Sequence, residues 1–261
     1  MEHHHPESEP ETRPAATLED VSTLKRWLFV IAAVSLLGIL TLLVHSGADQ
    51  KKPIPVKETK VRKERKGGAM QGTVNGHKWV DLGLPSGTRW ATCNVGAEKP
   101  EESGEYYAWG ETEPKEEYID INSLTHRKDT TWLINNGIIG KDGKLTKEHD
   151  IATIEWGEPW RMPTDEEFEE LIVECDWKFT DYQGTMGYLV TGPNSEKIFI
   201  VAAAFKQGST AEYTNDYGDY WSSTVVPDLI GAACSLGYSS KSYGRRRYAR
   251  FAGRSIRPVM D

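Results

Sequence analysis

The residue types that could bind or transform a ligand are concentrated in the last forty residues. Between Leu229 and Met260 there is no Asp or Glu. The same stretch holds seven basic residues: Lys241, Arg245, Arg246, Arg247, Arg250, Arg254 and Arg257. Guanidinium groups bind carboxylates, sulfates and phosphates through paired hydrogen bonds, and neighbouring Tyr and Ser side chains are typical of adaptable binding surfaces. The segment therefore predicts a surface that binds a ligand.

We expect this segment to contain a binding loop, residues 238–250, between two strands that define the fold. A solvated charged hairpin with Gly244 at its turn is the alternative. Arg257 is expected to be structural, paired with a core carboxylate, and Trp221 is expected to be half-buried. The predicted ligand-binding residues are Trp221, Ser223, Tyr238, Tyr243, Arg245, Arg246, Arg247 and Arg250.

Catalytic and metal-binding signatures are not found in the sequence. His77, His126 and His149 have no metal-ligand spacing, and no G-x-S-x-G nucleophile elbow occurs. Cys234 lies in an apolar run, which is typical of a buried strand thiol. Residues 158–160 (EPW) lack the amide oxygen that calcium-dependent lectins use. We therefore predict no enzyme, no cofactor and no metal site.

The charge distribution excludes general binding to nucleic acid. The chain has 261 residues and a net charge of -8, and residues 67–261 hold 30 acidic and 20 basic side chains. An acidic body repels a polyphosphate, so that only a local basic patch can attract an anion.

Three segments are predicted to precede the domain. Residues 1–26 form a disordered polar tail. Residues 27–44 are an uncharged apolar run, about 27 Å long as a helix, and predict a transmembrane helix over 27–46. A cleaved signal peptide or a buried core helix are the alternatives. Residues 47–71 form a basic linker, and the domain spans 72–261.

The membrane orientation is contested within the sequence. Residues 51–66 hold eight basic and two acidic side chains. By the positive-inside rule this flank belongs in the cytoplasm, together with the domain that follows it.

The sequence of the domain predicts short strands with few helices, which is an α+β class. Asn75-Gly76 and residues 85–87 predict turns, and residues 105–110 predict an aromatic strand. Thr164 and Glu167 form a capping box ahead of an apolar stripe, which predicts a helix, and Asp150 is expected to precede a short helix. Further strands are expected at 188–190, 198–201, 220–223, 232–238 and 255–259.

Five motifs occur in an order that closely resembles the Fibrobacter succinogenes major paralogous domain family. They are WVDLGLPSGTRWATCNVGA (79–97), YYAWGETEPK (106–115), WGEPWRMPTDEEFEELI (156–172), YWSST (220–224) and GRSIRPV (253–259). The resemblance covers about residues 73–261. It implies a C-type-lectin-like fold, a twisted antiparallel sheet with one or two flanking helices, behind a single transmembrane helix.

The resemblance also implies an extracytoplasmic, surface-anchored binding or adhesion module that recognises a protein, a glycan or an anionic polymer. It suggests a disulfide between Cys93 and Cys175, both in family-like motifs; two buried thiols are the alternative. A receptor diversified by a retroelement, with variation in a segment like 220–257, is the second hypothesis. A formylglycine-generating enzyme is the third, and is disfavoured because its second cysteine and its Arg-Gly-Gly-Ser-Trp motif are missing.

Overall fold

Antiparallel strands dominate residues 70–212 and 215–261, the part of the chain that the computed structural model describes. These residues belong to one compact unit, Arg65–Asp261. The predicted tail and transmembrane helix lie outside the described residues, as does all but the end of the linker. The α+β class is thus confirmed as a sheet-rich domain with short helices.

The first sheet joins the beginning of the described chain to its end. Its strand order is β1-β2-β3-β12, and the predicted turn at Asn75-Gly76 is confirmed, with φ of 51° and 85°. These positive φ values suit a two-residue hairpin and explain the Asn-Gly pair. The strands are β1 (Gln71–Val74), β2 (His77–Asp81), β3 (Arg89–Ala91) and β12 (Val259–Met260).

The helices follow the capping signals closely. The Thr164 side chain accepts from the Glu167 N–H, and the Glu167 side chain accepts from the Thr164 N–H, so the predicted capping box is confirmed. Asp150 accepts from Thr153 N–H and begins the expected short helix. The helical elements are η1 (Asp120–Asn122), α2 (Thr130–Asn135), α3 (Ile151–Trp156) and α4 (Asp165–Glu174).

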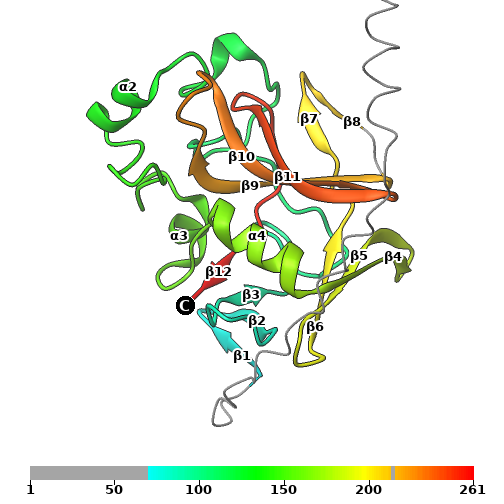
Figure 1. Cartoon of the computed structure of the whole chain (residues 1–261). Coiled ribbons are helices and arrows are strands. Elements are labelled where there is room, and N and C mark those ends of the chain that lie inside the picture. The colour runs from blue at the N-terminus through cyan, green and yellow to red at the C-terminus, as the bar shows by residue number, and fades with distance from the viewer. Residues whose placement is uncertain (1–69, 213–214) are drawn as a thin grey trace, which may run out of the picture. The chain divides into compact units, whose positions relative to one another are not determined.

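Three further sheets complete the domain (Figure 1). One has the order β4-β5-β6, with β4 (Asp176–Tyr182), β5 (Thr185–Thr191) and β6 (Lys197–Val201). A second pairs β7 (Phe205–Gln207) with β8 (Thr210–Glu212). The third has the order β11-β10-β9, with β9 (Tyr217–Val225), β10 (Ala232–Ser239) and β11 (Ser242–Ala249).

The sheet of β9, β10 and β11 separates two hydrophobic cores. Neighbouring residues of a strand point to opposite faces, so Tyr220 packs in one core and Trp221 in the other. Leu236 and Tyr238 of β10 join the core of Tyr220, on the face that α4 covers. Figure 1 shows α4 lying across this sheet. Because both faces of β10 are covered, every residue of β10 except Ser239 is buried.

Two predicted strands are shorter than expected. Only Tyr107 of residues 105–110 forms a β-bridge, to Arg254, since Gly104 and Gly110 adopt positive φ and turn the chain on either side. The expected strand at 255–259 is reduced to β12, because Pro258 has no N–H to donate to a ladder.

The predicted binding loop is a β-hairpin. Strand β11 pairs with β10 in unbroken register from Ala232↔Ala249 to Ser239↔Ser242. The turn falls at residues 240–241, and Gly244 lies within β11 rather than at the turn. The hairpin is therefore confirmed, the turn expected at Gly244 was wrong, and the binding role of the hairpin stays a prediction.

Candidate binding surface

Strand β11 exposes half of the predicted ligand-binding residues, namely Tyr243, Arg245, Arg246 and Arg247. Its residues Ser242 to Arg247 are exposed except for Gly244, which is half-buried. Tyr243 and Arg245 contact β4 and α4, so their side chains lie on the face that α4 covers, and alternation places Arg247 there too. Arg246 lies on the other face, where its side chain covers Gly237 beside the Tyr217 hydroxyl.

Arg245 is held by the acidic first turns of α4. Its Nη1 lies 2.8 Å from Asp165 Oδ2, and its Nη2 lies 3.1 Å from Glu169 Oε1. Burial raises the pKa of Asp165, and the charge of Arg245 opposes this shift. Two acidic residues in the first turns of α4 thus neutralise one of the three consecutive arginines.

Arg246 and Arg247 form no ion pair with any residue that the structure describes. Arg246 Nη1 donates to the carbonyl oxygen of Arg245 over 3.2 Å. Two adjacent guanidinium groups, one on each face of the strand, therefore keep their charge available to a ligand.

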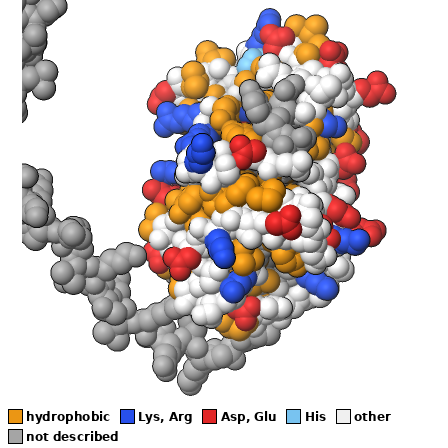
Figure 2. Space-filling view, turned by 90° about the vertical axis from the view of Figure 1, so that its right-hand side faces the viewer, with side chains coloured by type: hydrophobic (Ala, Val, Ile, Leu, Met, Phe, Trp, Pro, Cys, Tyr) orange, Lys and Arg blue, Asp and Glu red, His pale blue; other side chains and the backbone are white. Residues whose placement is uncertain are grey.

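An aromatic cluster lies at the turn end of β11. The Tyr243 ring stacks on Trp177 of β4, with centroids 4.7 Å apart and planes at 14°, and both rings meet Tyr188 edge-on. Phe179 also packs edge-on against Tyr188. Figure 2 shows hydrophobic side chains gathered in a band across this side of the molecule. Trp177 and Phe179 were not among the predicted site residues, although their spacing of two residues is the signal of one strand face.

Four predicted ligand-binding residues are buried, which corrects their assignment: Trp221, Ser223, Tyr238 and Arg250. They lie where the sheet meets other parts of the chain, and their polar groups bind backbone oxygens. Trp221 Nε1 donates to Tyr107 O over 3.0 Å, Ser223 Oγ to Pro163 O over 3.3 Å, and Tyr238 OH to Ile200 O over 2.7 Å.

Arg250 supports the loops beside β10. Its Nε donates to Ala232 O over 2.8 Å, and its Nη1 donates to Thr125 O and Lys128 O over 3.1 and 3.0 Å. Burial lowers the pKa of Arg250 to about 10. The Arg250 guanidinium is therefore part of the frame, together with Arg257, and does not face a ligand.

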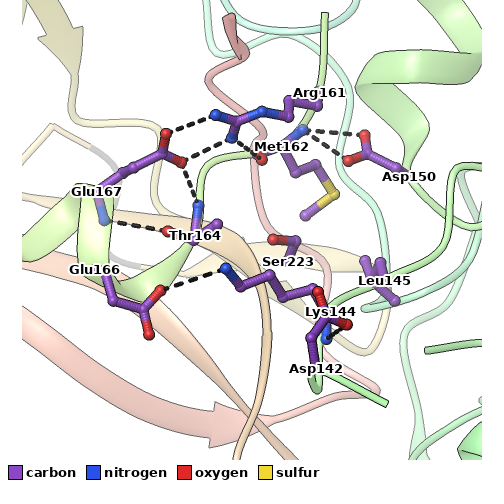
Figure 3. Close-up of a pocket in the computed structure, with 10 residues that line it drawn as sticks. All are labelled: Asp142, Lys144, Leu145, Asp150, Arg161, Met162, Thr164, Glu166, Glu167 and Ser223. Carbon is purple, nitrogen blue, oxygen red and sulfur yellow. Dashed lines mark hydrogen bonds and ion pairs between the residues drawn. The ribbon is translucent and has the colours of Figure 1, made fainter. Parts of the chain in front are cut away.

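A polar cleft of about 500 Å³ opens beside α4 (Figure 3). Most of its charged groups already have partners: Arg161 donates to both carboxylate oxygens of Glu167 over 2.8 and 2.7 Å, and the Met162 N–H donates to Asp150. Burial raises the pKa of Asp150. No motif in the sequence predicts this cleft. It is lined by Asp142, Lys144, Leu145, Asp150, Arg161, Met162, Thr164, Glu166, Glu167 and Ser223.

The three cysteines are free thiols, so the structure does not contain the predicted Cys93–Cys175 disulfide. The reason is their location: Cys175 packs in the core that contains Phe168, while half-buried Cys93 donates to the Glu98 carbonyl over 3.4 Å in the loop after β3. Cys234 is buried, as expected. Within residues 70–212 and 215–261, no group of three or more His, Cys, Asp or Glu side chains is arranged to hold a metal ion.

Comparison with known proteins returned no relationship. No family model, no curated protein and no solved structure matches this chain. Among the helices of the described residues, none is long and apolar enough to cross a membrane.

Proposed function

We propose that this chain is a membrane-anchored, non-catalytic binding module whose ligand site is the outer strand of the β10–β11 hairpin. The observation that carries the proposal is the contrast between the two strands. Seven of the eight residues of β10 are buried, while Tyr243, Arg246 and Arg247 of β11 are exposed. A rigid strand thus presents cationic and aromatic groups at fixed positions, which lowers the entropy cost of binding.

The C-type-lectin-like fold and the family resemblance are part of the same proposal. They are supported by the burial of the motif residues on which the resemblance rests. Trp90, Trp160 and Trp221 are fully buried, as is Arg257, whose Nε donates to Asn94 Oδ1 over 2.8 Å. Arg257 was expected to pair with a carboxylate and instead binds an amide and two backbone carbonyls.

The environment of Cys234 supports a role without catalysis. Cys234 is the residue on which a formylglycine-generating activity would depend. Burial raises the pKa of its thiol to about 11, so that the nucleophilic thiolate is scarce at neutral pH. A measured oxidase activity that is lost in Cys234→Ser would refute the non-catalytic proposal.

A receptor diversified by a retroelement is the second candidate. The observation that favours it is that the exposed positions from Lys241 to Arg247 lie on a buried frame, so their side chains can change without loss of packing. The test is genomic: a reverse transcriptase gene and a near-repeat of the DNA encoding residues 220–257 beside this gene. Without both, this second candidate is rejected.

The binding proposal is tested with the full-length chain in lipid nanodiscs, immobilised on a biosensor. The probes are poly-L-glutamate, a sulfated polysaccharide and a neutral glucan. We expect at least one anionic probe to bind, and the double variant Arg246→Ala/Arg247→Ala to bind it at least tenfold more weakly. The control is Lys147→Ala, which removes an exposed positive charge far from β11 in the sequence. Equal binding by the double variant would exclude the hairpin as the surface.

The extracytoplasmic location needs a separate test, since the basic flank at residues 51–66 favours the opposite orientation. Protease is added to intact cells and, as the control, to lysed cells. Surface display predicts digestion of the domain in both. A domain digested only after lysis would exclude the surface location.

A further inference from the structure

We propose that the free edge of β11 binds an extended acidic peptide segment of a partner protein, which adds to the β11-β10-β9 sheet as a fourth strand. The proposal rests on the binding function proposed above and narrows its ligand to a peptide. Strand addition takes affinity from main-chain hydrogen bonds and specificity from the side chains that flank them.

The backbone of β11 is ready for such pairing. In a hairpin with a two-residue turn, the residues that flank the turn, Ser239 and Ser242, bond to each other. The backbone groups of Tyr243, Arg245 and Arg247 therefore point away from β10. Within residues 70–212 and 215–261, the Arg246 guanidinium is the one group hydrogen-bonded to them, at the Arg245 oxygen, and no described strand pairs with this edge.

The usual structural protections of an edge strand are missing from β11. Proteins block edges with bulges, with prolines or with very short strands. Strand β11 has eight residues without proline, and its register against β10 is unbroken, whereas the pairing of β9 with β10 shifts near Ala233. Among the described residues, this edge is guarded by charge and by the Arg246 guanidinium at the Arg245 oxygen.

That charge selects the occupant. The guanidinium groups of Arg246 and Arg247 flank the edge on opposite faces, and neither has an ion-pair partner in the described structure. A basic strand is repelled, and a second copy of β11 would place arginines against arginines. A strand with carboxylates on both faces gains from both charges, so an acidic segment fits this edge best.

The aromatic cluster gives the peptide an anchor at one end. Tyr243 is 37% exposed and stacks on half-buried Trp177 at the turn end of β11. An apolar side chain of the added strand, on the face that α4 covers, would meet these rings. We therefore expect a segment that combines acidic residues with one large apolar residue.

The experiment uses the full-length chain in nanodiscs and a blocked, fluorescent heptapeptide of sequence VEEVEEF, whose carboxylates fall on both faces of an extended strand. Two further versions carry backbone N-methyl groups, one on the odd-numbered amides and one on the even-numbered amides. Only one set of amides faces β11 in an added strand. Fluorescence anisotropy should therefore show that one N-methylated version binds at least tenfold more weakly than the unmethylated peptide, while the other binds with little change. Hydrogen exchange of residues 242–249 should slow on binding.

Variants of the protein separate strand addition from charge. Arg247→Pro removes an outward N–H and the guanidinium but no bond to β10, whereas Arg247→Ala removes the guanidinium alone. Arg247→Pro should therefore bind the peptide at least tenfold more weakly than Arg247→Ala. Arg246→Glu keeps the backbone and should weaken binding of the acidic peptide while strengthening that of a Lys-for-Glu version. Lys147→Glu is the control for a charge change elsewhere on the surface.

The outcomes distinguish strand addition from the more general binding function proposed for the β10–β11 hairpin. Equal binding of both N-methylated peptides, or unchanged hydrogen exchange in β11, would overturn strand addition. If the anionic probes still bind in a manner sensitive to Arg246 and Arg247, the hairpin remains a binding surface of another kind. If neither the peptides nor those probes bind, both proposals fail.

Discussion

Arg245 donates from Nη1 to Asp165 Oδ2 over 2.8 Å, and this ion pair joins the exposed strand β11 to the first turn of α4. This ion pair distinguishes Arg245 from the two arginines that follow it. Arg245 is compensated by the helix, while Arg246 and Arg247 have no ion-pair partner among the described residues.

Removing this pair should cost little stability. A double-mutant cycle with Arg245→Ala and Asp165→Ala should give a coupling energy below about 1 kcal/mol, because side chains as exposed as Arg245 gain little from ion pairing in water. Urea unfolding followed by Trp fluorescence measures it, and added NaCl should reduce it further. A coupling energy above about 2 kcal/mol, insensitive to salt, would make the pair a main support of the hairpin.

Arg257 should behave in the opposite way. Its buried guanidinium donates to Asn94 Oδ1, Ala91 O and Thr92 O over 2.8 to 3.1 Å. Arg257→Met leaves these acceptors buried without donors, and should lower the free energy of unfolding by about 3 kcal/mol or more. Arg246→Met, at an exposed position, should change it by less than about 0.5 kcal/mol. Similar losses for the two variants would contradict the structural role of Arg257.

Glu167 should make the domain sensitive to acid. Burial opposes its ionisation, but hydrogen bonds from Arg161, Thr164 and Thr88 outweigh that effect, and the pKa of Glu167 lies below 4.5. A depressed pKa contributes stability that is present above pH 4.5 and is lost as the pH falls through the folded-state value.

We therefore expect Glu167→Gln to lower the free energy of unfolding at neutral pH, and the gap to the parent protein to narrow below pH 4.5. Urea unfolding across this range measures the gap. Glu166→Gln is the control, since the Glu166 side chain is 69% exposed. A gap that is independent of pH would mean that the loss is one of packing alone.

The cysteines should differ in reactivity. Burial raises the pKa of Cys175 to about 12 and that of Cys234 to about 11, whereas Cys93 is half-buried. Iodoacetamide should alkylate Cys93 in the native protein and all three after unfolding, as mass spectrometry would show. If Cys93 and Cys175 both stay unmodified until a reductant is added, they form the disulfide that the family resemblance suggests.

Local chemistry was readable from the sequence. The Asn75-Gly76 turn and the capping box of Thr164 and Glu167 depend on residues at most three positions apart, so their outcome follows from residue type and spacing. The bounds of short elements were less certain, because Pro258 and the glycines at 104 and 110 ended strands that their neighbours favour.

The roles of the arginines were decided by tertiary structure alone. The sequence shows a run of basic residues, and it concentrates the predicted site in that run. Arg250 became part of the frame because the carbonyls of Thr125 and Lys128 lie beside it, and Arg257 because Asn94 does. A guanidinium group is stable inside a protein only where such distant acceptors replace water, and their position is set by long-range packing that no local pattern encodes.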